Sequence, residues 1–192
     1  MYDSATGAGW GIGGSKGITA GRKGYKSSLF EGGINVPFIA RWPGKITAGR
    51  IDSQSLISAV DLLPTFCELG GMKLPADYRP DGISQVATLM GQPYPKRTKP
   101  LFWKIQAAWP PRNEQPDHWA GFVVVDGHWK LLTSSDGSHA ELYHLQDDPL
   151  EKNDQSSSRP EVVAELEQKL SAWQTSLPAH PGGDVFSRER GQ

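Results

Sequence analysis

The sequence contains little cysteine, no long apolar segment and no run of basic residues. Cys67 is the only cysteine, which excludes an internal disulfide. No apolar run approaches the roughly 20 residues of a membrane-spanning helix, so we expect no membrane partner. The formal net charge is −1 and the basic residues are scattered. We therefore expect no nucleic-acid partner either, because binding to a phosphate backbone needs concentrated positive charge.

Turn-forming and aromatic residues are abundant instead. Glycine (22) and proline (15) together supply 37 of the 192 residues, which favours short elements joined by turns over a helical bundle. The hydrophobic fraction is 37% with seven tryptophans, so we expect a folded chain with a sizeable core. The opening residues, MYDSATGAGWGIGG, lack the charged and apolar regions of a signal peptide and resemble a loop entered midway.

Two strands are predicted in the first half of the chain. Residues 34–41 (INVPFIAR) form a continuous apolar run with β-branched residues, followed by a Trp-Pro-Gly turn. That pattern predicts a buried strand. Residues 55–58 suggest a second, shorter strand.

A helix is predicted for the segment DLLPTFCELGG. Asp61 would cap it, and Pro64 falls in the first turn, where a missing N–H costs nothing. Gly70 and Gly71 would end it. A Pro-rich connection with a short helix near residues 86–90 follows.

The second half predicts a small antiparallel sheet covered by one helix. Asp126-Gly127 would form the turn of a central hairpin. Ser158 and Glu161 would form a capping box that starts a helix reaching to about residue 177. The strands are expected at residues 101–105, 119–125, 128–134 and 140–145. We place a domain boundary near residue 95, so that residues 1–95 and 96–192 form separate units.

Several chemistry-bearing residues are most simply explained by structure. The segment GWGIGG (residues 9–14) matches a dinucleotide-binding fingerprint, but no strand precedes it and no helix follows, so we interpret it as a loop. Cys67, between Phe66 and Glu68, is expected to be a buried, inert thiol. No histidine pair has metal-binding spacing. His118, beside Trp119, is the histidine that could face a pocket, although a surface position is the commoner outcome.

The segment KSSLFEGG (residues 26–33) places a lysine five residues before a Glu-Gly-Gly turn. The pair Gly32-Gly33 permits positive backbone angles and close approach of the main chain. Glu31 could hold this structural turn by accepting backbone N–H groups, and Lys26 would then be a fixed point charge for an anion. From local chemistry alone, a surface lysine beside a structural turn is the simpler interpretation.

The order of several segments resembles one protein family. GYKSSLFEGGINVPFIARWPGKI, SAVDLLPTFCELGG, RPDGIS, LFW, VVVDGHWKLL and ELYHLQDDPLEKND follow one another as in the C-terminal part of type I sulfatases of the arylsulfatase family. The resemblance covers about residues 24–177. It implies the end of an α/β domain of the alkaline-phosphatase-like fold, followed by a small antiparallel sheet with a packed C-terminal helix.

The resemblance assigns a role to Lys26. In the family, the lysine at this position binds the sulfate group and the bridging oxygen of the substrate, which makes Lys26 the expected catalytic and substrate-binding residue. His118 is added as a second substrate-binding candidate, and Glu31, Gly32 and Gly33 form the turn at the site. Many relatives carry Arg at the position of Asn35, which alters the surroundings of the site.

Other parts of the family's machinery are absent from the sequence. The family nucleophile is a formylglycine made within a Cys/Ser-x-Pro-x-Arg motif, which does not occur here. The paired aspartates and the Asp-Asn-Gly segment of the family's calcium site are also absent. We therefore expect a C-terminal piece of a sulfatase that needs the N-terminal portion, and with it formylglycine and calcium, for activity.

Other functions remain open at the level of sequence. One is a phosphate- or phosphonate-ester hydrolase of the same superfamily. Another is a non-catalytic carbohydrate-binding module that uses Trp109 and Trp119. For a sulfatase, the expected substrate is a sulfated carbohydrate or small molecule, selected in part by residues 106–119. Members of the family are commonly exported.

Overall fold

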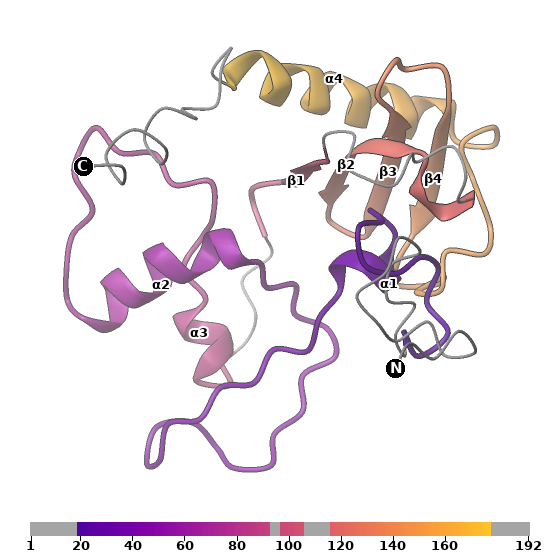
Figure 1. Ribbon diagram of the computed structural model, residues 1–192. Coiled ribbons are helices and arrows are strands. Elements are labelled where there is room, and N and C mark those ends of the chain that lie inside the picture. Colours follow the sequence, from indigo (N-terminus) through magenta and orange to yellow (C-terminus); the bar gives the residue numbers. More distant parts are fainter. Residues whose placement is uncertain (1–18, 93–96, 106–115, 178–192) are drawn as a thin grey trace, which may run out of the picture.

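The computed structural model describes residues 19–92, 97–105 and 116–177 (Figure 1). An N-terminal group of short helices precedes an antiparallel sheet, and a long helix follows it. The elements are α1 (Glu31–Ile34), η1 (Ala59–Asp61), α2 (Leu62–Leu69), α3 (Val86–Leu89), β1 (Leu101–Lys104), η3 (Pro116–His118), β2 (Ala120–Asp126), β3 (Trp129–Ser134), β4 (Ala140–His144) and α4 (Pro160–Ser176).

The sheet confirms the predicted antiparallel architecture. Its four strands are adjacent in the order β1-β2-β3-β4. The hairpin between β2 and β3 pairs Asp126 with Trp129, so its two-residue loop is Gly127-His128 rather than the predicted Asp126-Gly127. Gly127 has φ of +58°, a conformation that glycine adopts without steric cost. The turn therefore begins one residue later than predicted because the first loop position requires the glycine.

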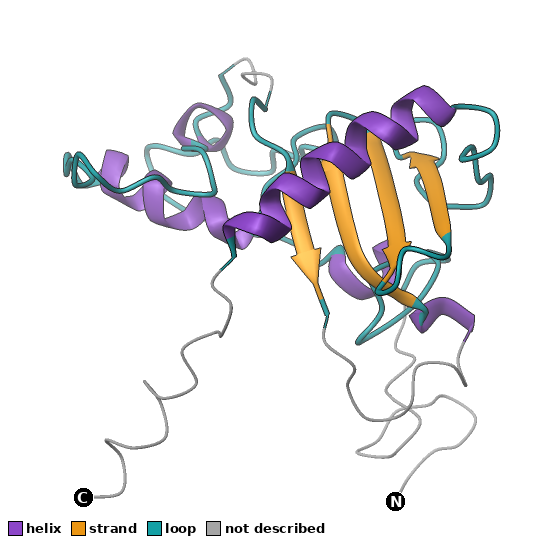
Figure 2. Cartoon of the chain, turned by 90° about the horizontal axis from the view of Figure 1, so that it is seen from above, coloured by secondary structure: helices purple, strands orange, loops and turns teal. Residues whose placement is uncertain are grey.

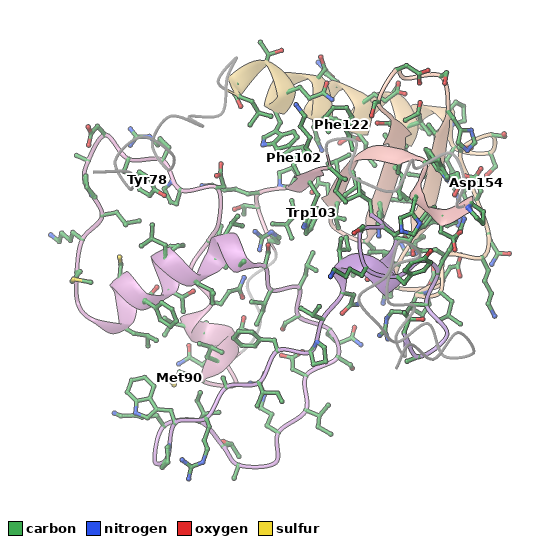
Figure 3. All side chains as sticks on the ribbon, in the orientation of Figure 1. Tyr78, Met90, Phe102, Trp103, Phe122 and Asp154 are labelled. Atoms are coloured by element: carbon green, nitrogen blue, oxygen red, sulfur yellow. The ribbon has the colours of Figure 1, made fainter. Side chains whose placement is uncertain are left out.

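Each face of the sheet buries a different set of side chains. On one face Val124, Leu131 and Leu142 pack against Leu166 and Leu170 of α4, which lies across the strands (Figure 2). Phe102 and Phe122 lie on this same side (Figure 3), and Phe102 stacks on Trp173 at 5.0 Å between ring centroids. Burial of one such large apolar side chain contributes about 1.5–3 kcal/mol.

The other face is covered by residues that precede the sheet by about seventy positions. Val123, Leu132 and Tyr143 pack against Leu29 and Phe30, of which Phe30 is fully buried. The alternation of side chains along β2 and β3 therefore supplies two apolar faces, as expected for strands covered on both sides. The segment that carries KSSLFEGG is thus part of the core of the sheet.

The start of α4 differs from the prediction. The helix begins at Pro160, with Arg159 at the N-cap and no side-chain cap. Ser158 donates its hydroxyl to the carbonyl of Gln155 instead, so the predicted capping box with Glu161 does not form. Proline is favoured in the first helical turn because its φ is already helical and its missing N–H would be unpaired there.

The predicted strand at residues 34–41 is wrong. Glu31–Ile34 forms the short helix α1, and residues 35–41 pair with no strand in the part of the chain that the structure describes. Val36 and Ile39 are 74% and 89% exposed. A strand requires a hydrogen-bonded neighbour, and the four strands of this sheet pair only with one another. Residues 55–58 are likewise not a strand.

Helices α2 and α3 form a lobe beside the sheet (Figure 1). Helix α2 has the predicted bounds and packs beside α3, which confirms both helices. Asp61 does not cap α2; its carboxylate accepts the N–H groups of Ser58 and Ile83. It also forms a bidentate ion pair with Arg97 at 2.8 and 2.9 Å. This buried pair ties the lobe to the segment that leads into β1.

We expect Asp61→Asn to lower the free energy of unfolding by about 3–5 kcal/mol, because it leaves the buried Arg97 guanidinium unpaired. Urea denaturation followed by tryptophan fluorescence measures the change. The same substitution in the half-exposed Arg50–Asp52 pair, Asp52→Asn, is the matched control and should cost less than about 1 kcal/mol. Equal losses in the two variants would contradict this role of Asp61.

The pH dependence follows from the same residue. Burial acts to raise the pKa of Asp61, but the Arg97 guanidinium and the N–H groups of Ile83 and Ser58 bring the pKa below its usual value of 3.8. The stability contributed by Asp61 is therefore present above that pH and is lost as pH falls through the folded pKa. Asp61→Asn should flatten the acid limb of the stability profile.

Candidate functional site

Residues 23–33 form a closed bend with Lys26 at its tip. The N–H of Gly32 donates to the carbonyl of Lys23 at 2.7 Å and closes the bend at its base. Within it, the N–H of Ser28 donates to the carbonyl of Tyr25 at 2.8 Å. Ser27 has φ of +74°, an uncommon angle for serine that reverses the chain direction here.

The diglycine permits close approach of backbone to backbone. A Cβ on Gly32 would lie 2.1 Å from the carbonyl oxygen of Gly24, and one on Gly33 would lie 2.2 Å from that of Ser28. Neither glycine has a positive φ. Glycine is therefore needed at both positions because a side chain would not fit, and not because the backbone adopts a positive φ.

The bend brings the two predicted substrate-binding residues together. Lys26 is exposed and makes no ion pair with any residue that the structure describes. The Nε2 of His118 lies 3.2 Å from the carbonyl oxygen of Lys26, and its ring contacts Tyr25 edge-on at 4.6 Å. His118 is buried, so the surface position expected for it is wrong. Its Nδ1 has no hydrogen-bond partner among the described residues.

A second contact fixes the same side of the bend. The hydroxyl of Ser28 donates to the carbonyl of Asp117 at 2.5 Å, next to the contact between His118 and Lys26. The helical turn η3 thus holds the tip of the bend through two hydrogen bonds. It enters β2 directly, so the position of the tip is set by the sheet.

The base of the bend is anchored to β4. The Nζ of Lys23 lies 3.0 Å from Oε2 of Glu141 and 3.1 Å from the hydroxyl of Tyr143. The same ammonium lies 4.1 Å from the centroid of the Phe30 ring, a cation–π contact. Burial and the neighbouring Glu141 carboxylate raise the pKa of Tyr143, so its hydroxyl stays protonated and donates to Glu141. The Lys23 ammonium is therefore used in structural contacts, whereas the Lys26 side chain is exposed.

Glu31 holds the turn in a different way from that expected. Its carboxylate accepts from Nζ of Lys130 and from Nδ2 of Asn35, both at 2.8 Å, rather than from backbone N–H groups. Asn35 therefore supplies a neutral donor to the Glu31 carboxylate. The backbone N–H of Glu31 donates to Glu151 at 2.7 Å.

Lys130 and Glu151 were missed as site residues by the sequence analysis. The apolar neighbours Trp129 and Leu131 predicted a strand at Lys130, but the sequence indicated a helix over only one face of the sheet, so nothing placed Lys130 in a buried face. Glu151 follows Asp148, whose carboxylate accepts the N–H groups of Lys152 and Asn153. The sequence indicated only a polar turn there, and no local pattern distinguishes Glu151 from an exposed acid.

The structure offers no metal site in residues 19–92, 97–105 and 116–177, where no group of three His, Cys, Asp or Glu residues could hold an ion. The described residues thus do not fit a calcium site.

Cys67 is buried in α2, as expected. No described helix is both long and apolar enough to cross a membrane.

The aromatic residues proposed for sugar binding are only partly within the described residues. Trp119 packs against the core of the sheet and contacts Phe30 and His139 edge-on. Its ring is thus used for packing rather than displayed as a platform. Trp109, most of the loop 106–119 and the segment GWGIGG lie outside the described residues.

The comparisons with known proteins decide the family. Residues 22–176 match the family described as N-sulphoglucosamine sulphohydrolase, C-terminal. The chain belongs to the sulfatase family. It is 30% identical over 167 residues to the N-acetylgalactosamine-6-O-sulfatase of Bacteroides thetaiotaomicron, covering 80% of this chain and 30% of that protein. It is 29% identical over 156 residues to human arylsulfatase K, with 78% and 27% covered.

Solved structures agree with the family assignment and the fold. A Bacteroides thetaiotaomicron structure described in terms of glycosaminoglycan metabolism superposes on this sulfatase chain with a TM-score of 0.62 and 29% identity. It covers 81% of this chain and 32% of the other. Ps i-CgsB in complex with k-i-k-neocarrahexaose gives 0.61 and 25%, with 76% and 30% covered. The match confirms the alkaline-phosphatase-like sulfatase fold, and the chain spans about a third of the length of these relatives.

In this sulfatase chain we expect Gly32→Ala to open the bend, because the new methyl group meets backbone atoms that cannot move aside. The cost should be about 1–3 kcal/mol of stability, as for other overpacked sites. Denaturant unfolding measures it, and NMR amide shifts of residues 24–33 report the local change. Gly70→Ala is the control, since a Cβ there would lie 3.2 Å from its nearest neighbour, the carbonyl oxygen of Phe66, and Gly70 has an ordinary φ of −84°. An unchanged bend in Gly32→Ala would contradict the steric role.

Proposed function

We propose that this chain is the C-terminal part of a sulfuric ester hydrolase and contributes the sulfate-binding Lys26. The observation that carries the proposal is the bend: among the described residues, the lysines that contact it are paired, whereas Lys26 is held at the tip by its own backbone and its side chain is exposed. Lys23 is bound to Glu141, and Lys130 to Glu31 and Glu151. A cation that is fixed but not neutralised suits an anionic substrate.

The chemistry explains why a fixed cation serves this reaction. Cleavage of a sulfate ester places negative charge on the leaving oxygen while the sulfuryl oxygens remain anionic. A preorganised ammonium stabilises that charge more in the transition state than in the ground state, and it needs no reorientation when the charge develops. His118 is proposed to support the substrate side of the bend through its Nε2, which lies 3.2 Å from the carbonyl oxygen of Lys26.

The remaining machinery is proposed to belong to the portion of a sulfatase that this chain does not cover. Two observations support this. The apolar run at residues 34–41 lacks a partner strand among the described residues, and the lobe exposes large apolar side chains. These are Val36, Phe38, Ile39, Trp42, Ile51, Val60, Leu63, Phe66, Met72 and Tyr78, the last lying on an outer loop (Figure 3).

The N-terminal portion would then supply formylglycine and the calcium ligands. Residues 1–95 would complete the α/β domain on that portion, and residues 96–192 would form the small C-terminal subdomain. Without the nucleophile and the metal, the chain is expected to be inactive alone. The substrate is proposed to be a sulfated carbohydrate or a sulfated small molecule. The relative named N-acetylgalactosamine-6-O-sulfatase and the carbohydrate complex of Ps i-CgsB support a sugar.

Complementation tests the proposal directly. The chain is assayed on sulfated sugars, an aryl sulfate and the matching aryl phosphate, first alone and then joined to the N-terminal two-thirds of the Bacteroides N-acetylgalactosamine-6-O-sulfatase. We expect no turnover by the chain alone and measurable sulfate release by the joined protein. Sulfate release by the isolated chain would contradict the division of the site, and release of phosphate instead of sulfate would favour the phosphoesterase alternative.

Lys26→Ala tests the role of the lysine in the joined protein. We expect kcat to fall by about 10²–10³, the usual loss when one preorganised electrostatic group is removed. The fold should be retained because the Lys26 side chain is exposed. Lys152→Ala, at another exposed lysine, is the control and should leave kcat unchanged. Near-normal turnover by Lys26→Ala would rule out its catalytic role.

A further inference from the structure

Lys130 forms a buried ionic network with two glutamates on the face of the sheet that carries the bend. Its side chain is fully buried, and its Nζ lies 2.8 Å from Oε1 of both Glu31 and Glu151. The Glu151 side chain is also fully buried. Two carboxylates thus share one ammonium inside the protein, and Asn35 is the additional donor to Glu31.

Glu151 contacts Glu31 in two ways. It accepts the backbone N–H of Glu31 and, through Lys130, is linked to the side chain of the same residue. Glu151 itself has φ of +54°, an unfavourable angle for a non-glycine residue that persists only where the surroundings impose it. Two buried groups, the Glu151 carboxylate and the Lys130 ammonium, therefore contact Glu31, the residue that precedes Gly32-Gly33.

This arrangement adds little to the stability of the sheet. The Coulomb attraction in a buried ion pair is largely offset by the cost of removing both charges from water, and apolar replacements of similar volume are often equally stable. Charged groups do, however, fix a distance and a direction that apolar contacts leave free.

We propose that Lys130 and Glu151 are positioning residues for Lys26. They hold Glu31 in place, Glu31 begins the Gly32-Gly33 turn, and the turn closes the bend that carries Lys26 at its tip. The small C-terminal subdomain thereby sets the location of a cation that acts on a substrate bound outside it. The inference concerns the geometry of the bend and takes its functional meaning from the proposed sulfate-binding role of Lys26.

The test uses the full 192-residue chain and a variant that removes both ion pairs, Lys130→Met/Glu31→Gln/Glu151→Gln, called the pair variant. The glutamine at position 151 keeps an acceptor for the N–H of residue 31, and no charge of the network is left buried without a partner. The matched control is Lys169→Met/Asp126→Asn, which removes a half-exposed ion pair between α4 and the end of β2. Urea midpoints, amide hydrogen exchange and NMR shifts are measured for the wild type and both variants.

We expect the pair variant to keep its urea midpoint and the protection of β3 amides such as Leu131. The amides of Gly32 and Gly33 should shift and exchange at least about tenfold faster, because the turn has lost its anchor. The control should leave both glycines unchanged. The proposal is overturned if the glycines behave as in the wild type. It is also overturned if the pair variant loses the sheet, since the network would then serve folding rather than position.

A titration with inorganic sulfate separates this inference from the proposed function. In the wild type the amides of the bend should titrate, and in the pair variant the apparent Kd should rise by roughly tenfold at unchanged stability, since small displacements of a binding group are costly. Equal Kd values would contradict the positioning role. If wild-type amides do not respond to sulfate, the proposed role of Lys26 is weakened, and the exchange data still decide whether Lys130 and Glu151 position the bend.

Discussion

The four-stranded sheet has two apolar faces, and both must be covered. Helix α4 follows the sheet in sequence and covers one face. The other face has no such neighbour and is covered by Leu29 and Phe30, which precede β1 by about seventy residues. The rest of the structure follows from this constraint, because the segment that fills the second face also carries the candidate anion site. Packing and binding are therefore combined in one short stretch of chain.

Much of this architecture could be predicted from local patterns. The apolar segments on either side of Asp126-Gly127 predicted the central strands, and the helical spacing of Leu166, Leu170 and Trp173 predicted the covering helix. The boundaries that were wrong have local causes. The hairpin shifted by one residue because Gly127 had to occupy the position with positive φ, and Pro160 displaced the expected cap of α4.

Other errors came from effects that no local pattern contains. Residues 34–41 have the composition of a strand, but composition does not provide a partner, and the exposed Val36 and Ile39 show that none is present among the described residues. Lys26 was identified through the family resemblance, since its own neighbours suggest only a surface lysine. His118 was expected at the surface and is buried because η3 packs it against the bend, a contact between positions 92 residues apart.

The wide separation in sequence of the groups that meet at Glu31 has a consequence for biosynthesis. Its N–H and the carboxylate of Glu151 are 120 positions apart. A ribosome makes the chain from its N-terminus, so the diglycine emerges long before the residues that secure it. The loop that joins them must close before the contact forms, which places its assembly late in folding. A chain that ended before the connection between β4 and α4 would contain Lys26 but not Glu151. In such an incomplete product the bend would not be held in place, so it could not bind a substrate.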